Sequence, residues 1–402
     1  MPIPHKRFAI GAVGAIAAFA LAGCASASPA SEQNEDAATD NHHEADTRVA
    51  VTYDGGVMVL DGDTLEPVGD AALSGFLRVN GAGDHDGHVF VTAENGFHVL
   101  DSGLASDTVE FTGELFPAAA AGHATPHAGR TVLFDDATGE SQVFDTDDIG
   151  SGTLPEITTL TSEAAHHGVA IELSDGTTLS TIGTSESRSG VRHLAEDGTE
   201  LARNEQCPSV HGEGALQDEV VMFGCEDGVL LFDNGALTKI DAPDEFGRTG
   251  NAYVSDTSRI AFGDYKTDPD QEGYLLSQLV RVDTESHTMS VVDLPDGVEY
   301  TWRGVGRDDL NNVVVLGADG TLTVLDENGS PQDSWSVIDP WESPTEWQQP
   351  HPGLRVVGDV AYVTEPSKDR ILAIDLHSGE VTADVTLDIV PNEFVVVGAS
   401  GH

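Results

Sequence analysis

Val313-Val314-Val315-Leu316-Gly317-Ala318-Asp319-Gly320-Thr321-Leu322-Thr323-Val324-Leu325-Asp326 is the stretch that decides the fold. It consists of a β-branched apolar run, a turn containing Asp319-Gly320, and a second apolar run. An Asp-Gly pair supplies the positive φ that a tight hairpin needs, so the stretch predicts two antiparallel strands. Similar Asp-Gly or Asn-Gly pairs recur along the chain, at Asn95-Gly96, Asp175-Gly176 and Asp227-Gly228.

The stretch ends in an apolar run followed by an acidic turn. We call such a run with its acidic turn a mark, and similar marks recur along the chain. Short apolar runs end in an acidic turn at Val59-Leu60-Asp61, Val99-Leu100-Asp101, Val143-Phe144-Asp145, His193-Leu194-Ala195, Leu231-Phe232-Asp233, Arg281-Val282-Asp283, Val324-Leu325-Asp326 and Ala373-Ile374-Asp375. The intervals between them are 40, 44, 50, 38, 50, 43 and 49 residues, and the fourth mark is degenerate, with its acidic residue shifted to Asp197. Such a period, with several short strands in each unit, predicts an all-β fold, a β-propeller.

The two ends of the repeating part are expected to meet. It begins with Arg48-Val49-Ala50-Val51-Thr52-Tyr53 and ends with Phe394-Val395-Val396-Val397-Gly398. A propeller closes its ring when strands from both termini build one blade, so we expect the last strand to pair in the blade of the first. Eight marks favour eight blades, while the degenerate fourth unit leaves seven open. A β-sandwich array or a β-helix is the structural alternative.

The N-terminus predicts export. Residues 1–23 have a basic start, an apolar run and then Leu21-Ala22-Gly23-Cys24, which matches a bacterial lipobox. This predicts a lipoprotein signal peptide, lipidation of Cys24 and anchoring at the cell surface or the periplasmic face of a membrane. The rival is an ordinary secretory signal with an incidental cysteine. Residues 24–47 are small, polar and acidic and predict a flexible tether, which contains His42 and His43. Residues 48–402 form the predicted propeller domain.

The net charge of the chain limits the kinds of molecule that it is expected to bind. It has 18 basic and 69 acidic residues, a formal net charge of −51. Nucleic-acid binding needs clustered Lys and Arg to replace phosphate counterions, so we expect no nucleic-acid partner. A field of this sign concentrates cations, although solubility or a salty habitat explains it equally well.

Two cysteines remain after Cys24, namely Cys207 and Cys225. An exported chain meets an oxidising environment, so we expect a disulfide between them. A metal site with thiolate ligands is the alternative.

Histidines recur at one position of the repeat. Five units carry a histidine followed within two residues by glycine, at His85, His127, His167, His211 and His351. Asn251 and Arg303 occupy about the same position in other units. Residues at the entry to each repeat converge near the axis of a propeller, so a metal could bind there.

His127, His167 and His211 come from successive units and are the preferred ligands. The other candidate ligands are His85, His88, Asp86, His123, His166 and Glu213, and His42 and His43 offer a low-affinity site on the tether. Imidazole with a carboxylate suits Zn²⁺, with copper and nickel as alternatives and calcium as a poorer match. A histidine near a glycine turn is more often an ordinary polar surface residue.

The chain resembles the AztD family of periplasmic or cell-surface zinc metallochaperones over about residues 40–402. The features are the lipobox, the tether histidines, Gly83-Asp84-His85-Asp86-Gly87-His88, His166-His167-Gly168, and Cys207-Pro208-Ser209-Val210-His211-Gly212-Glu213 followed by Phe223-Gly224-Cys225-Glu226-Asp227-Gly228. The resemblance implies a propeller that binds zinc and transfers it to the solute-binding protein of a zinc ABC transporter.

We therefore expect a zinc metallochaperone and not an enzyme. The sequence contains no Gly-x-Ser-x-Gly elbow, Gly-x-Gly-x-x-Gly loop or P-loop. Two alternatives stay open: a metal-dependent hydrolase or lactonase on a propeller, and a metal-free surface scaffold. A scaffold predicts histidines that are scattered, whereas the other two predict histidines within about 5 Å of one another.

Overall fold

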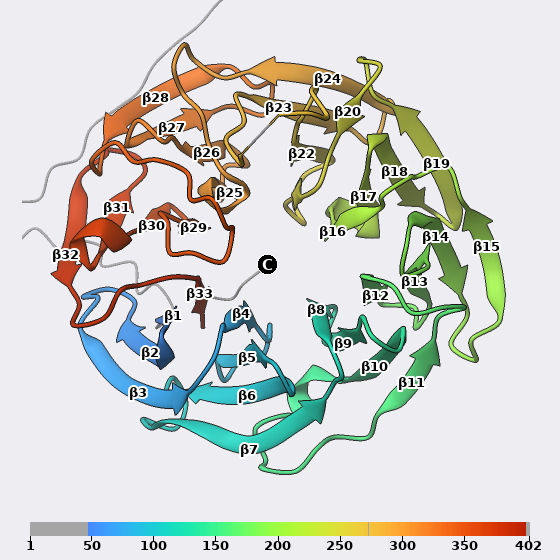
Figure 1. The fold of residues 1–402 in the computed structure, drawn as a ribbon, viewed down its shortest axis with the longest axis horizontal. Coiled ribbons are helices and arrows are strands. Elements are labelled where there is room, and N and C mark those ends of the chain that lie inside the picture. The colour runs from blue at the N-terminus through green and yellow to red at the C-terminus, as the bar shows by residue number, and fades with distance from the viewer. Residues whose placement is uncertain (1–46, 272, 399–402) are drawn as a thin grey trace, which may run out of the picture. The chain divides into compact units, whose positions relative to one another are not determined.

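A computed structural model describes residues 47–271 and 273–398 of the chain. Within these residues, eight antiparallel sheets stand around a central axis as the blades of a propeller (Figure 1). The prediction of an all-β propeller is confirmed, and the number of blades is eight. The expected signal peptide, Cys24, His42 and His43 lie outside the described residues. The described part of the chain contains no helix with the length and apolarity to cross a membrane.

The strands of each blade are given from the axis outward. Blade 1 contains β33 (Phe394–Val397), β1 (Arg48–Tyr53), β2 (Gly55–Asp61) and β3 (Pro67–Leu73). Blade 2 contains β4 (Arg78–Gly81), β5 (His88–Ala93), β6 (Gly96–Ser102) and β7 (Val109–Pro117). Blade 3 contains β8 (Ala121–His127), β9 (Arg130–Asp135), β10 (Glu140–Asp145) and β11 (Thr158–Thr161). Blade 4 contains β12 (Ala170–Glu172), β13 (Thr178–Gly183), β14 (Arg188–Leu194) and β15 (Glu200–Asn204).

The second half of the ring continues the same order. Blade 5 contains β16 (His211–Ala215), β17 (Val221–Cys225), β18 (Asp227–Asp233) and β19 (Ala236–Asp241), and the short β20 (Gly247–Arg248) pairs with β18. Blade 6 contains β21 (Ala252–Tyr253), β22 (Ile260–Asp264), β23 (Gln278–Asp283) and β24 (Thr288–Asp293). Blade 7 contains β25 (Val305–Arg307), β26 (Val313–Leu316), β27 (Thr321–Leu325) and β28 (Pro331–Ser336). Blade 8 contains β29 (Leu354–Val357), β30 (Val360–Glu365), β31 (Arg370–Asp375) and β32 (Val381–Thr386). In the part of the chain that the structure describes, four single-turn 3₁₀ helices lie between strands: η1 (Thr146–Asp148), η2 (Gln217–Glu219), η3 (Trp302–Gly304) and η4 (Pro366–Lys368).

The acidic marks of the sequence have a structural role at the end of the third strand of each blade. Asp61 ends β2 and accepts hydrogen bonds from the backbone N and Oγ1 of Thr64, which closes the turn toward the outer strand. Such side-chain-to-backbone bonds are why aspartate favours turns. In the degenerate fourth unit, Asp197 takes this part by accepting from the backbone N of Thr199, at 2.9 Å. The unit nevertheless forms a full blade, which is why the ring has eight blades and not seven.

The hydrophobic core is divided into layers between neighbouring blades. Both faces of an inner strand are buried, so its side chains alternate between two layers. In β1, Val49 and Val51 pack toward blade 8, while Ala50 packs toward blade 2. The ring closes as expected, because β33 pairs antiparallel with β1, with Arg48 opposite Val397 and Val51 opposite Phe394. Each blade thus depends on both of its neighbours.

Candidate metal centre

Three histidines from successive blades meet at the start of the innermost strands. His123 lies in β8, His167 precedes β12, and His211 is the first residue of β16. One ligand nitrogen from each lies within 4.8 Å of those of the other two. The ring centroids are 5.2 Å apart in all three pairs. We call His123, His167 and His211 the histidine cluster.

The backbone around His211 explains its place in the cluster. Gly212 has φ +61°, and a Cβ there would lie 2.4 Å from the carbonyl oxygen of Gly250. That same carbonyl accepts a hydrogen bond from Nδ1 of His211 at 2.6 Å. Asp264 fixes the loop by accepting from the backbone N of Gly250 and of Asn251, at 2.6 and 2.8 Å. Glycine at 212 therefore permits the contact that orients the imidazole.

Hydrogen bonds leave two nitrogen lone pairs directed at one another. Nδ1 of His167 contacts Asp136 Oδ2 at 2.6 Å, and Nδ1 of His211 contacts the Gly250 carbonyl. Each of these oxygens accepts, so the proton of each neutral imidazole lies on Nδ1 and Nε2 carries a lone pair. The two Nε2 atoms are 3.1 Å apart. Two nitrogens bound to one tetrahedral zinc ion stand about 3.3 Å apart. The geometry suits a shared cation.

Burial keeps the cluster ready to bind a cation. Burial lowers the pKa of His211 to about 4, with repulsion from His167, Arg188 and Arg248 adding to it, despite the hydrogen bond to Gly250. Burial, together with the neighbouring histidines, holds the pKa of His123 well below its usual range. Neutral imidazole is the form that binds metals. These two rings therefore need to lose no proton at neutral pH before they bind zinc.

Glu213 stands beside the cluster as a carboxylate. Its Oε2 is 3.9 Å from Nδ1 of His123, and its Oε1 accepts from Thr125 Oγ1 at 3.2 Å. Burial raises the pKa of Glu213 to about 7. A nearby dication would favour its ionised form. Glu213 is therefore placed to orient His123 or to compensate the charge of a bound ion.

His127, expected to stand beside His167 and His211, lies elsewhere, and His123 takes its place in the cluster. His127 ends β8, four residues after His123, and four residues of strand span about 13 Å. Its Nε2 lies 2.9 Å from Glu219 Oε1. The glycine that follows it, Gly129, belongs to the turn between β8 and β9. The His-Gly pattern marks a turn at this position and not the entry to the blade.

A second group of candidate ligands lies at the other face of the ring. His88 begins β5, which is antiparallel to the innermost strand β4, so it lies at the opposite end from the strand starts. Asp84, Asp86 and His88 offer ligand atoms within 4.8 Å of one another. Asp84 Oδ2 contacts Nδ1 of His88 at 2.5 Å, and this bond, with the nearby carboxylates, raises the pKa of His88 although burial opposes the shift.

Two other predicted ligands among the described residues, His85 and His166, join neither group. His85 is exposed in the turn before β5. His166 is 2% exposed, and both of its ring nitrogens have protein partners, the carbonyl of Ala164 at 2.9 Å and Thr181 Oγ1 at 3.0 Å. Asp136 was not predicted, because its link to His167 spans two blades and leaves no local pattern.

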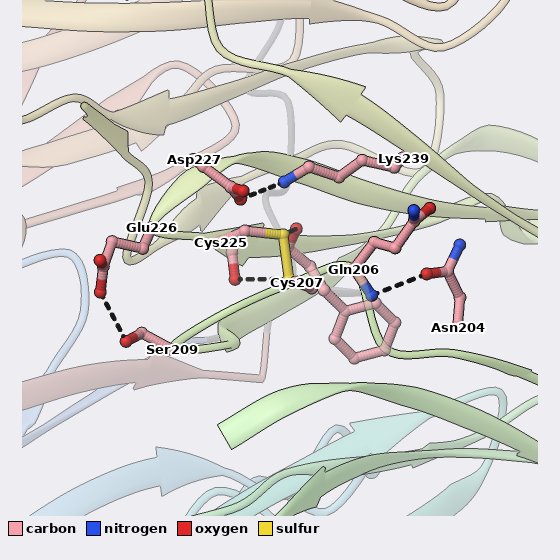
Figure 2. The surroundings of a disulfide bond; sticks show 10 residues. Asn204, Gln206, Cys207, Ser209, Cys225, Glu226, Asp227 and Lys239 are labelled. Carbon is pink, nitrogen blue, oxygen red and sulfur yellow. Dashed lines mark hydrogen bonds and ion pairs between the residues drawn. A yellow bond between two sulfur atoms is a disulfide. The ribbon is translucent and has the colours of Figure 1, made fainter. Parts of the chain in front are cut away.

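The expected disulfide is present next to the cluster. Cys207 and Cys225 are bonded and fully buried between blades 4 and 5 (Figure 2). Cys225 follows Gly224, which pairs with His211 across β16 and β17. Ser209 Oγ donates to Glu226 Oε2 at 2.8 Å and so links the same two segments of the chain a second time. The backbone that carries His211 is thereby fixed on both sides.

The chain is similar in sequence and in structure to known proteins. No family model matches the chain. The zinc chaperone AztD of Citrobacter koseri is 24% identical over 294 residues, which cover 70% of this chain and 66%, just under two thirds, of that protein. The structure of apo AztD from Citrobacter koseri matches with a TM-score of 0.76 and 22% identity, over 89% of this chain and 100% of that one.

A third protein shares the fold at greater distance. The dihydro-heme d1 dehydrogenase NirN, in complex with DHE, matches with a TM-score of 0.59 and 13% identity, over 89% of this chain and 76% of that chain. A propeller of this kind therefore also occurs in an enzyme, and the fold alone does not decide function. The sequence match and the structural match to AztD together confirm the expected resemblance. The chain resembles AztD both in its sequence and in its fold.

Proposed function

We propose that the protein binds Zn²⁺ as a cargo at His123, His167 and His211 and transfers it to another protein. The observation that carries the proposal is the pair of Nε2 lone pairs that face each other at 3.1 Å, each fixed by a partner on Nδ1. Such partners set the tautomer and the orientation of a metal ligand. Convergence of three histidines also disfavours a metal-free scaffold, which would have scattered them.

The exposure of the cluster supports transfer and not only storage. The side chain of His167 is 45% exposed, whereas that of His123 is 20% exposed. A zinc site with three protein ligands keeps a fourth position open, and an exposed ligand lets an acceptor enter the coordination shell before the ion leaves. The resemblance to AztD supports the solute-binding protein of a zinc ABC transporter as the acceptor.

The N-terminal predictions complete this proposal. Residues 1–23 direct export, lipidated Cys24 anchors the protein at the cell surface or the periplasmic face of the membrane, and residues 24–47 form a tether to the propeller of residues 48–402. His42 and His43 on this tether capture zinc weakly, and the group of Asp84, Asp86 and His88 is a further candidate site.

Zinc binding tests the proposal directly. Residues 25–402, prepared metal-free, should bind zinc as measured by metal analysis and by competition with a chelator of known affinity. Replacing His123 or His211 by Ala should weaken the tightest site by more than the roughly 10–100-fold expected for Asp136→Asn, which removes only an orienting partner. His127→Ala is the matched control and should bind as the unaltered protein does.

Two results would contradict this assignment. A protein without measurable zinc affinity would refute the function, and equal affinity in His123→Ala and His127→Ala would refute the ligand set.

A second experiment tests transfer. The zinc-loaded protein is mixed with a metal-free solute-binding protein, and zinc is measured in each protein after separation. Transfer should be faster than spontaneous dissociation into a chelator.

A zinc hydrolase is the second candidate, and Glu213 is the observation that favours it. A buried carboxyl with a pKa raised to about 7 is suited to proton transfer near neutral pH. This function predicts that the zinc-loaded protein turns over members of an ester and lactone panel, with loss of activity in Glu213→Gln. The chaperone proposal predicts no turnover above that of free zinc.

A further inference from the structure

Two arginines lie across the ring from the histidine cluster, and a third lies in the blade next to that of His123. Arg303 precedes β25 in blade 7 and Arg355 lies in β29 of blade 8, four blades away from His123 and His167 respectively. Arg78 begins β4 in blade 2. All three lie at or near the start of an innermost strand, as the histidines do, and therefore at the same face of the propeller. We call Arg78, Arg303 and Arg355 the arginine arc.

A single carboxylate partners this arc among the described residues. Glu393, which precedes β33 and is 6% exposed, accepts from Arg303 Nη2 at 2.9 Å and from Arg78 Nε at 3.4 Å. Arg355 donates one hydrogen bond, from Nη1 to the carbonyl of Leu354 at 2.8 Å. Three guanidinium groups and one carboxylate leave a formal charge of +2. This local positive charge contrasts with the net charge of −51 of the whole chain.

Burial raises the cost of the net positive charge of the arc. The side chain of Arg303 is 3% exposed and, besides its bond to Glu393, donates from Nη1 to Asn392 Oδ1 at 2.8 Å and from Nη2 to the Trp347 carbonyl at 3.1 Å. Its buried Nε has no hydrogen-bond partner in the described part of the chain. Burial lowers the pKa of Arg303 to about 10, with repulsion from Arg355 and Arg78 opposing the attraction of Glu393. The group remains protonated at neutral pH. Because Glu393 is shared between Arg303 and Arg78, the arc keeps a net positive charge, and an added anion would reduce the cost of holding that charge away from water.

Aromatic rings give the arc flat walls. Arg303 lies over Trp302 at 5.2 Å, Arg78 over Trp347 at 5.5 Å, and Arg355 over Phe394 at 5.4 Å, each measured from the guanidinium carbon to the ring centroid. A small, partly open recess beside them has room for about one water molecule. Arg303, Arg355, Asn392, Glu393, Trp302 and Phe394 line it. The recess is too small to enclose a dicarboxylate, so such a ligand would contact the guanidinium groups from its open side.

We propose that the arginine arc is a binding site for carboxylate groups, separate from the histidine cluster. Guanidinium groups bind carboxylates with charge-assisted hydrogen bonds, and the charge of +2 matches a dicarboxylate. The ligand is either a free small dicarboxylate or the acidic side chains of a protein. The site does not depend on zinc, so it stands or fails independently of the proposed function.

The fluorescence of Trp302 and Trp347 provides a direct measurement, because both rings contact the arc. The full chain, free of metal, is titrated with succinate at constant ionic strength, and we expect a saturable change by about 10 mM. Arg78→Gln and Arg355→Gln should each weaken binding by about ten-fold or more, because each removes a charged donor. The Arg78 side chain is 36% exposed, so its replacement leaves the core intact.

Arg203→Gln is the matched control for charge. Arg203 pairs with Glu163, Glu200 and Glu205 around the outer strand β15, so its loss changes the net charge equally without touching the arc. This variant should bind succinate as the unaltered protein does. The absence of a saturable signal in the unaltered protein overturns the proposal. So does unchanged binding in either arc variant that remains folded by circular dichroism.

A blocked Gly-Glu-Glu-Gly peptide distinguishes the two sources of the carboxylate. Tighter binding of the peptide than of succinate identifies acidic protein side chains as the ligand, and the reverse order identifies a free dicarboxylate. Inorganic phosphate is the comparison for shape, because it is tetrahedral and should bind more weakly than succinate. Phosphate that binds tighter than both carboxylate probes overturns the assignment of the ligand class.

Discussion

The five His-Gly motifs have different physical causes. At His211 the glycine has a positive φ and lets the Gly250 carbonyl approach the imidazole. At His167, a Cβ on Gly168 would lie 2.4 Å from the Phe134 ring, so glycine is needed for packing between blades. At His127 the glycine belongs to a hairpin turn. One local pattern thus arises from a close approach, a packing contact and a turn, and only the first two place a histidine in the cluster.

His351 is one of the buried histidines that should make stability depend on pH, and it lies outside the histidine cluster. It is 3% exposed, and burial, aided by repulsion from Arg303, lowers its pKa to about 4. In the unfolded chain its pKa returns to about 6.5. Between these values the unfolded state binds the extra proton, so stability falls as the pH falls. This residue should contribute a loss of roughly 2 kcal/mol between pH 7 and pH 5.

Urea unfolding of the metal-free protein at both pH values measures this contribution. His351→Gln should reduce the pH dependence of the free energy of unfolding by about that amount. His287→Asn, at an exposed position whose φ of +54° suits asparagine, is the control and should leave the dependence unchanged. Equal pH dependence in His351→Gln and the unaltered protein would show that another group is responsible.

At the scale of the element, the disulfide should affect both the stability of the fold and the affinity of the metal site. Cys207 and Cys225 close a loop with a sequence separation of 18 residues, and loop-closure entropy gives such a cross-link about 3 kcal/mol. The double variant Cys207→Ala, Cys225→Ala should therefore lose about that much free energy of unfolding. Because the cross-link fixes the strand start that carries His211, zinc affinity should fall as well.

Unfolding with and without a reductant tests this prediction. The reductant should destabilise the unaltered protein to about the level of the double variant and should have no effect on the double variant itself. If zinc affinity survives in the double variant while stability falls, the hydrogen bonds of Pro208 and Ser209 to Glu226 are sufficient to place His211.

At the scale of the whole molecule, ring closure by β33 determines stability. β33 pairs with β1, and the segment before it is fixed by buried hydrogen bonds, from Thr52 N to the Glu393 carbonyl at 2.8 Å and from Glu393 N to Thr52 Oγ1 at 3.0 Å. A chain that ends at Asn392 lacks this strand. Its free energy of unfolding should fall by more than the roughly 3–5 kcal/mol that the loss of one buried phenylalanine side chain typically costs.

A chain that ends at Gly398 keeps β33 and serves as the control for truncation. It should unfold at the same urea concentration as the full chain, whereas the chain ending at Asn392 should unfold at a lower concentration and less cooperatively. Equal midpoints for the two truncated chains would mean that the seven remaining complete blades hold the ring without the closing strand.

Much of the fold could be predicted because its signals are local. Alternating apolar residues, Asp-Gly turns and the acidic mark at the end of each third strand all act within a few residues, and their period indicates a propeller. The degenerate mark at Ala195 left the blade number open, because Asp197 makes the same kind of turn bond from a shifted position. Complementary strands at the two ends of the chain also predicted how the ring closes.

The sequence by itself determined the all-β repeat, its closure and the pairing of Cys207 with Cys225, and it predicted histidines at the entry to the repeats. Only the tertiary structure decided which histidines meet. His123 and His127 lie in one strand, but their separation of four residues along it places them at opposite faces of the ring. The partners Asp136 and Gly250, and the arginine arc around Glu393, come from blades far apart in sequence. Contacts between blades are set by the closed ring, which no local pattern encodes.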